Sequence, residues 1–218
     1  SKYSKARYME LMALLYDILQ KARKEGLMAI EKDVDEPHES AIFKKYAVVG
    51  SDHHVVEFIT DYLRMMVSGN LNAHEIETLM DSEIETHHQE AHAPVAAIAR
   101  LAGGLPAFGI VAAVLGVVNT MGSVGQPPAV LGAMIGSALV GTFLGILLAY
   151  GVFEPIGGLM EQKVEESGKE FQCIKTTLLA SMQGYAPATA VEFGRKVLFS
   201  DVRPTFSELE NHVKGKKA

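Results

Sequence analysis

The sequence contains a single cysteine, Cys173, and no tryptophan. One cysteine excludes an intramolecular disulfide and a zinc site built from several thiolates. Acidic residues outnumber basic ones, with 26 Asp and Glu against 20 Lys and Arg, so the formal net charge is −6. This balance argues against nucleic-acid binding, which normally needs a basic face. Aromatic residues make up only 7% of the chain, which argues against a surface for base stacking.

Charge is missing altogether from one part of the chain. Residues 101–153 contain no Asp, Glu, Lys, Arg or His. Two apolar runs lie within this segment, at about 105–121 and 129–152, and each is long enough to cross a hydrocarbon core of ~30 Å as a helix. The turn sequence GSVGQPP separates them. The pattern predicts a transmembrane helical hairpin. The alternative is a hairpin buried in a soluble core, but neither run has the polar stripe typical of such helices.

Small residues are concentrated in the same segment. Eleven of the 20 glycines fall within residues 101–153. Small residues repeated along a helix let membrane helices approach closely, so we expect tight packing between the two runs. The glycines concerned are Gly109 and Gly116 on the first run and the pairs Gly132/Gly136 and Gly141/Gly145 on the second.

The charged flanks indicate how the hairpin is oriented. Arg100 precedes the first run, and Lys163 and Lys169 follow the second, whereas the connecting turn has no basic residue. The positive-inside rule therefore places both flanks in the cytoplasm. We predict three segments: a cytoplasmic helical region over 1–100, the hairpin over 101–153, and a cytoplasmic helical extension over 154–218.

Helical patterns fill the remainder of the chain. Apolar residues recur at steps of three and four over residues 1–25 and 52–68, and each pattern ends at a glycine, Gly26 or Gly69. No segment reads convincingly as a strand, so we predict an all-α membrane protein. Further expected features are a capping box at Asn72 and Glu75 that starts a long helix, and helices over 154–182, 188–199 and 207–214, the last capped by Thr205 or Ser207.

Catalytic and metal-binding signatures are weak. His88 and His92 are four residues apart, but the sequence between them reads HQEAH and not the HExxH of zinc proteases. There is no phosphate-binding glycine loop and no nucleophile with a matched base. We therefore expect no enzyme activity, no metal and no cofactor, and we expect Cys173 to be a small buried apolar residue.

The spans offer hydroxyls but no acidic residue, lysine, arginine or histidine, so a proton carrier must come from a partner or from another part of the chain. The Thr142 hydroxyl has two open roles, lining a hydrated path or bonding back to a carbonyl of its own helix. Pro106 and Pro155 lie at the cytoplasmic ends of the two runs, either with a special role or simply as helix terminators.

A charged zone in the first segment is either a solvated face or a docking surface. It comprises Arg23, Lys24, Glu31, Lys32, Asp33, Asp35 and Glu36.

Four long stretches carry a family resemblance: LPAFGIVAAVLGVV at 105–118, VGTFLGILLAYG at 140–151, GYAPATAVEFGRK at 184–196 and RPTFSELE at 203–210. Through them the chain resembles the flagellar-motor stator subunits of the MotA/TolQ/ExbB proton channel family. The resemblance implies a pentameric ring in the bacterial inner membrane, built around a dimer of the partner MotB. It also implies that MotB supplies the proton-binding aspartate and that proton flow drives the ring against the rotor protein FliG.

The resemblance also implies roles for individual residues. Pro106 and Pro155 match two prolines that couple proton flow to torque. Thr142 matches a pore-facing threonine, and Ala113 faces the same pathway. Sodium-driven relatives carry a hydroxyl where Ala113 stands, which favours protons here.

For rotor binding, the resemblance implies that Arg23 and Glu31 meet FliG and that Glu83 matches a further acidic position. The family's stators have two more spans before the cytoplasmic region, so we expect this sequence to be a piece of a longer chain whose hairpin is the third and fourth span. The alternative function is an ExbB/TolQ-type energiser of a partner that spans the periplasm.

Overall fold

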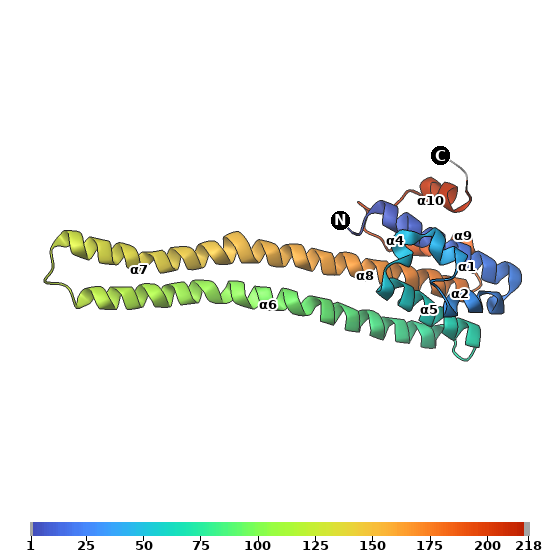
Figure 1. The fold of residues 1–218 in the computed structure, drawn as a ribbon, viewed down its shortest axis with the longest axis horizontal. Coiled ribbons are helices and arrows are strands. Elements are labelled where there is room, and N and C mark those ends of the chain that lie inside the picture. Colours follow the sequence, from blue (N-terminus) through green and yellow to red (C-terminus); the bar gives the residue numbers. More distant parts are fainter. Residues whose placement is uncertain (1, 216–218) are drawn as a thin grey trace. The chain divides into compact units, whose positions relative to one another are not determined.

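The computed structural model describes residues 2–215, and these residues form helices and turns without any strand (Figure 1). The all-α prediction is thereby confirmed. The elements are α1 (Lys5–Glu25), η1 (Leu27–Ile30), α2 (Glu31–Asp35), α3 (Ala41–Lys45), α4 (Ala47–Gly50), α5 (His53–Ser68), α6 (Ala73–Met121), α7 (Pro128–Leu148), η2 (Ala149–Phe153), α8 (Glu154–Met182), α9 (Pro187–Lys196) and α10 (Phe206–Val213).

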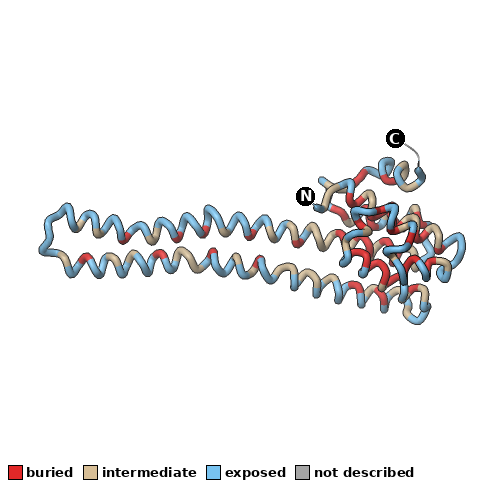
Figure 2. The backbone as a smooth tube through the Cα atoms, viewed as in Figure 1, coloured by how far each residue is buried: buried red, intermediate tan, exposed pale blue. Residues whose placement is uncertain are grey.

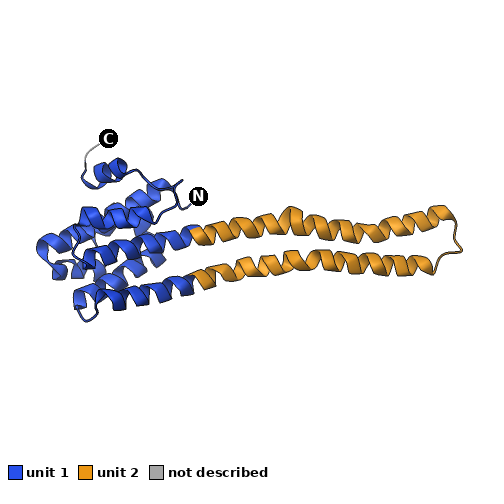
Figure 3. Ribbon diagram, turned by 180° about the vertical axis from the view of Figure 1, so that it is seen from behind, with its two compact units in different colours: residues 1–87, 166–218 blue, residues 88–165 orange. Residues whose placement is uncertain are grey.

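The chain divides into two compact units (Figure 3). Unit 1 comprises Ser1–His87 and Glu166–Ala218, and unit 2 comprises His88–Glu165. Helices α6 and α8 each contribute residues to both units. The predicted boundaries at residues 100 and 153 concern where the membrane begins, and they stay a prediction.

Unit 1 is built around α1, which packs against η1, α4, α9 and α10. Apolar side chains at helical spacing along α1 are fully buried, including Leu11, Leu14 and Ile18. The tube view shows this concentration of buried backbone in unit 1 (Figure 2). Phe58 of α5 and Phe171 of α8 meet edge to face with ring centroids 5.0 Å apart, which links α5 to α8. Cys173 is fully buried in the same core, as predicted.

The helix ends in unit 1 follow local chemistry. Asn72 Oδ1 accepts hydrogen bonds from the backbone N–H groups of His74 and Glu75, while a Glu75 carboxylate oxygen accepts one from the Asn72 N–H. Thr205 and Glu208 form the same reciprocal box at α10. α1 ends at Gly26, whose φ of 94° favours glycine. These predicted boundaries are confirmed.

Unit 2 contains two apolar helical segments that are long enough to cross a membrane, one within Ala73–Met121 and one within Pro128–Met182. Only 11% of each apolar window is buried. A core helix of a soluble protein would be mostly buried, so the soluble alternative is wrong. Large apolar side chains such as Phe108, Leu115 and Phe143 are instead exposed, which suits contact with lipid or with other helices.

The prolines do not end the helices. α6 continues through Pro106, and Pro155 is the second residue of α8, so simple helix termination is wrong at both positions. Pro155 has no N–H to donate to the Gly151 carbonyl, and its ring would crowd that carbonyl in a regular helix. The π-helical turn η2 includes Gly151 and lies directly before α8. A wider turn at this place accommodates the proline without breaking the helix.

Candidate functional site

The first candidate site is a seam of small residues between α6 and α7 in unit 2. A Cβ added to Gly109 would lie 2.7 Å from the Gly141 carbonyl oxygen, and one added to Gly145 would lie 2.6 Å from the Leu105 carbonyl oxygen. A Cβ on Gly116 would collide with Ala138. The seam therefore depends on the absence of side chains at these positions.

The seam uses only part of the predicted glycine set. Gly132 and Gly136 have nothing within 4 Å of an added Cβ among the described residues. The expectation of tight packing is therefore correct for Gly141 and Gly145 but wrong for Gly132 and Gly136 in this structure. The reason is geometric, because the spacing of small residues does not say which face of a helix meets its neighbour.

Thr142 makes its hydrogen bond across this seam. Its hydroxyl donates to the Gly109 carbonyl oxygen on α6 at 3.2 Å. The alternative of a bond to its own helix is therefore wrong, and it fails because the bare Gly109 backbone comes close enough to compete. At 3.2 Å the bond is longer than the ~2.7–2.8 Å usual between oxygens. The bond therefore joins the two helices at a place where their backbones nearly touch.

Ala113 lies about one helical turn along α6 from Gly109, which is the acceptor of Thr142. A Cβ on Gly141, the neighbour of Thr142, would lie 2.8 Å from the Ala112 Cβ and 3.9 Å from the Ala113 nitrogen. The two residues that the resemblance assigns to one pathway therefore both lie beside the seam, about one helical turn apart. Whether that pathway exists stays a prediction.

The two prolines lie at different levels of the hairpin. Leu105, next to Pro106, faces Gly145, whereas Gly157, two residues after Pro155, faces Ile98. Because Pro155 precedes Gly157 by two residues, its level on α6 is near residue 100, and the six residues from there to Pro106 correspond to ~9 Å along a helix. A coupling role for both prolines would therefore act at two separate points.

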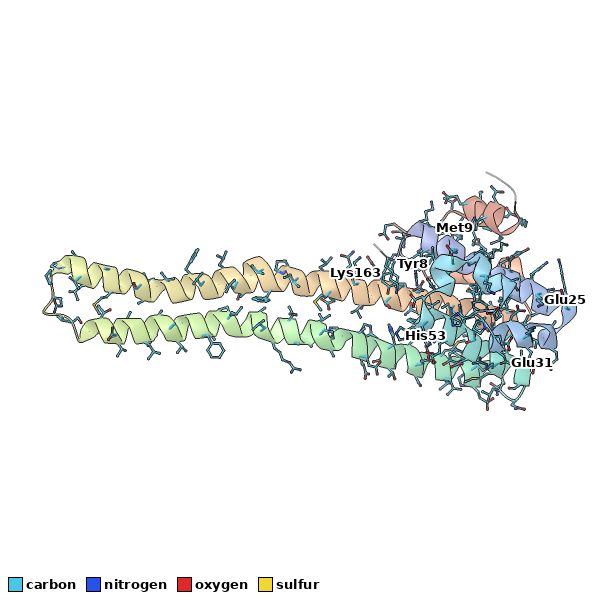
Figure 4. The ribbon with its side chains drawn as sticks, in the orientation of Figure 1. Tyr8, Met9, Glu25, Glu31, His53 and Lys163 are labelled. Carbon is cyan, nitrogen blue, oxygen red and sulfur yellow. The ribbon has the colours of Figure 1, made fainter. Side chains whose placement is uncertain are left out.

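The second candidate site is the charged end of unit 1 that contains Arg23 and Glu31. Arg23 is in the last turn of α1 and Glu31 opens α2, with the turn η1 between them. Both are exposed, and neither side chain has a hydrogen bond or ion pair with any other residue in 2–215. Glu25 and Glu31 lie at one end of unit 1, and Tyr8 and His53 lie at the other (Figure 4).

Not every residue of the predicted charged zone belongs to this surface. Asp33 is only 8% exposed. Its carboxylate accepts hydrogen bonds from the Lys21 ammonium at 2.7 Å and the Ser40 hydroxyl at 2.6 Å. Asp33 is therefore a structural residue that ties α2 to α1 and to the cap of α3, and the interpretation of it as part of an exposed face is wrong.

Glu83 has a partner within unit 1. The Tyr62 hydroxyl on α5 donates to its carboxylate at 2.6 Å. Burial, followed by this bond and by the Glu83 charge, raises the pKa of Tyr62 above its usual value. Glu83 thus joins α6 to α5, and its predicted rotor contact stays a prediction.

Unit 1 contains a buried charge network that the sequence pattern did not predict. Arg7 Nε and Nη2 donate to the two Glu170 carboxylate oxygens at 2.6 and 3.0 Å, and Nη2 also donates to Asp52 at 2.6 Å. Arg7 and Glu170 are only 4% and 1% exposed. Burial raises the pKa of Glu170, and the Arg7 guanidinium partly opposes that rise. A signal did exist, because Arg7 lies on the stripe formed by Leu11, Leu14 and Ile18.

One group of side chains has the spacing of a metal site. The ligand atoms of His53, His54 and Glu57 lie within 4.8 Å of one another. All three side chains are exposed, and they occupy the first turns of α5, where the helix dipole disfavours a cation. The ligand types suit a divalent transition metal, but among the residues that the structure describes no buried partner holds the imidazoles in place.

The fold and both sites define a helical membrane protein with an uncharged two-span hairpin and a charged helical unit. The chain belongs to the MotA/TolQ/ExbB proton channel family, whose model matches residues 51–173. It is 53% identical to Motility protein A of Escherichia coli K12 over 217 residues, which is 100% of this chain and 74% of that protein. Its predicted class, a membrane protein of this family without enzyme activity, is thereby supported.

Two solved structures are similar in fold. The Campylobacter jejuni MotAB structure matches with a TM-score of 0.72 at 23% identity, covering 89% of this chain and 69% of that chain. The flagellar MotAB stator complex of Bacillus subtilis matches with a TM-score of 0.69 at 25% identity, covering 92% and 69%. The motility names of these relatives favour the stator hypothesis over the ExbB/TolQ-type energiser.

Proposed function

We propose that this chain is a stator subunit of the bacterial flagellar motor that couples proton flow to torque on the rotor. The observation that supports this most directly is the uncharged hairpin of residues 101–153 in a chain 53% identical to a motility protein. Such a hairpin can wall a proton path but cannot carry the proton itself. The carrier is then a carboxylate of a second protein.

The partner in this proposal is MotB, because the structural relatives are MotAB complexes. An aspartate of MotB takes up a proton from one side of the membrane and is neutralised, which changes its preferred position against a pentameric ring of this subunit. Loss of the proton on the cytoplasmic side resets the position. The inner membrane of a bacterium, which maintains a proton gradient, is the location that this cycle requires.

Different residues of the hairpin have different roles in this proposal. The Thr142 hydroxyl, which bonds across the seam about one helical turn from Ala113, can exchange its carbonyl acceptor for a water or a partner carboxylate. Pro106 and Pro155 each remove one backbone donor from a continuous helix and so define points where it can bend. Bending at these points converts a change near the carboxylate into motion of the helices.

The rotor-binding part of the proposal places Arg23 and Glu31, with Glu83 as a further candidate, against the rotor protein FliG. Unpaired charges of opposite sign guide and orient a partner more than they add affinity. Glu83 is the weaker candidate, because its carboxylate already accepts the Tyr62 hydroxyl.

Charge reversal tests this proposal. The full-length protein carrying Arg23→Glu or Glu31→Lys would be expressed in a motile bacterium deleted for its own subunit, and swimming speed would be measured. Each reversal should impair swimming, and a compensating charge change in the rotor should restore it. Lys44→Glu is the matched control, because Lys44 is exposed and, within residues 2–215, pairs with exposed Glu39 alone. Normal swimming with both reversals would remove the docking role of the pair.

Pro155→Leu tests the coupling role separately. Leucine restores a backbone donor and the regular helix, so the protein should still reach the membrane and assemble while swimming is largely lost. Membrane fractionation and swimming speed would be measured together. Normal swimming with this change would count against the role assigned to Pro155.

A further inference from the structure

Two hollows flank η1, the short turn between Arg23 and Glu31. The first has a volume of about 410 Å³ and lies beside Arg23. The second has a volume of about 390 Å³ and lies beside Glu31. Both belong to unit 1. Each charge of the proposed docking pair thus has a cavity next to it.

The first hollow is mainly apolar. Leu27 of η1 and Tyr185 line it and are 42% and 46% exposed. Leu19, Met66 and Met182 contribute further apolar walls from α1, α5 and α8, and Arg23 is its only charged lining residue. Gly184, with φ of 89°, ends α8 and turns the chain so that Tyr185 forms one wall. The Tyr185 N–H donates to the Ala180 carbonyl at 3.2 Å, which holds this turn.

The second hollow has the opposite charge. Met28 is 65% exposed and lines it together with Glu31, Asp35 and Arg64. The Arg64 guanidinium is already engaged, by Asp35 at 3.1 Å and Asp61 at 2.8 Å. Among the charged residues that line this hollow, Glu31 is therefore the one whose side chain has no hydrogen bond or ion pair within residues 2–215. Adjacent residues of one turn, Leu27 and Met28, thus offer apolar side chains to two hollows of opposite sign.

We propose that the 410 Å³ hollow is an anchor site for an apolar side chain on an amphipathic helix of the rotor partner, whose neighbouring carboxylate pairs with Arg23. This inference rests on the proposed stator function and adds an apolar anchor to a contact otherwise described by charge. A basic residue further along the same helix meets Glu31 across Met28.

The walls of the site favour a helix as the occupant. They come from helices and turns, and the described residues contain no sheet edge to which an extended peptide could add a strand. A helix satisfies its own backbone hydrogen bonds and needs only side-chain pockets. The order of charges along η1, basic at Arg23 and then acidic at Glu31, selects a partner helix with the complementary order.

The experiment uses the full-length protein in swimming cells. A photo-crosslinking amino acid, benzoylphenylalanine, would replace Leu27 in one strain and Val48, which is 54% exposed on α4 outside the hollow, in another. Adducts would be probed for this chain and for the rotor protein. We expect a rotor adduct from position 27 and none from position 48.

Two substitutions test the anchor without removing a charge. Ser181→Leu fills the hollow from the last turns of α8, and Leu27→Asp makes its wall polar. For this comparison benzoylphenylalanine would replace Tyr185, which lines the same hollow, so that position 27 is free for substitution. Since interface energy concentrates in a few anchoring contacts, each substitution should weaken the rotor adduct from position 185 about tenfold and slow swimming. Ser207→Leu and Val48→Asp are the matched controls, because they make the same chemical changes on exposed positions elsewhere in unit 1. Immunoblots of membranes would confirm equal amounts of protein.

Different outcomes would count against the apolar anchor and against the stator function on which it rests. If Arg23→Glu impairs swimming while Ser181→Leu and Leu27→Asp do not, the anchor is wrong and the stator function stands. An adduct between two copies of this chain in place of the rotor would also overturn it. If neither the charge reversals nor the anchor variants affect swimming, the docking role itself falls and the anchor falls with it.

Discussion

The two units are both helical, yet they are held together in opposite ways. Unit 1 buries large apolar side chains of α1, α5 and α8 and also a network of charges centred on Arg7. Unit 2 buries almost nothing and joins its helices through positions that lack side chains, such as Gly109 and Gly116. The core of unit 1 is of the kind found in proteins surrounded by water, where the burial of apolar surface stabilises the packed helices. In lipid the burial of apolar surface no longer favours helix association, so unit 2 depends on close backbone contact.

This comparison predicts that the two units fail for different reasons. Unit 1 should be most sensitive to loss of a charge partner, and unit 2 should be most sensitive to the gain of a methyl group. The following substitutions test each part of that contrast, beginning with the largest expected effect.

Arg7→Leu should destabilise unit 1 by ~3–5 kcal/mol, because it leaves Glu170 buried without its counter-charge. The purified full-length protein in detergent would be unfolded with urea and followed by loss of α1 protection in hydrogen exchange. The double variant Arg7→Leu with Glu170→Leu should recover much of this loss, since it removes both charges. A double variant no more stable than the single one would show that Arg7 and Glu170 contribute more to stability than the neutralisation of each other's charge.

Gly116→Ala should destabilise the hairpin by ~1–3 kcal/mol, because the new methyl group meets Ala138. Gly136→Ala makes the same change in α7 where nothing lies within 4 Å, and it should gain up to ~1 kcal/mol from better helix propensity. Thermal unfolding in detergent would compare the two. Equal effects would contradict the seam, and a loss at Gly136 alone would place another helix against that face.

Glu208→Gln should have the smallest effect and should be visible only through pH. The Lys5 ammonium, followed by Thr205, lowers the pKa of Glu208 from 4.5 to about 2. Because the folded-state pKa lies below the unfolded one, its contribution is complete above pH ~4.5 and is lost as the pH falls from there through about 2. The free energy of unfolding of the variant, measured between pH 2 and pH 6, should therefore change slightly less with pH than that of the parent. Identical slopes would show that this exposed pair contributes nothing.

The sequence was informative wherever the cause of structure was local. The capping residues Asn72 and Thr205 and the terminating Gly26 were predictable, because each acts within one helical turn. The hairpin was predictable as well, since length and missing charge define it. The resemblance identified Thr142 and Arg23 but gave no contacts for them.

What the sequence did not yield were relations between distant segments. Arg7 lies on an apolar stripe, but its partner Glu170 is 163 residues away and no spacing rule connects them. The acceptor of Thr142 is on the opposite helix, 33 residues away, and depends on how closely Gly109 approaches. Helix continuation through Pro106 and Pro155 also depended on context, because proline alone predicts a stop.

The wide separation of Arg7 and Glu170 also sets an order of events during synthesis. α1 leaves the ribosome long before α8, so its apolar stripe and its arginine must wait while the whole hairpin is made. Non-local contacts of this kind are slow to form and leave apolar surface open in the meantime. Synthesis of α6 and α7 therefore precedes closure of unit 1. A nascent chain stalled before Glu170 would be a natural target for chaperones.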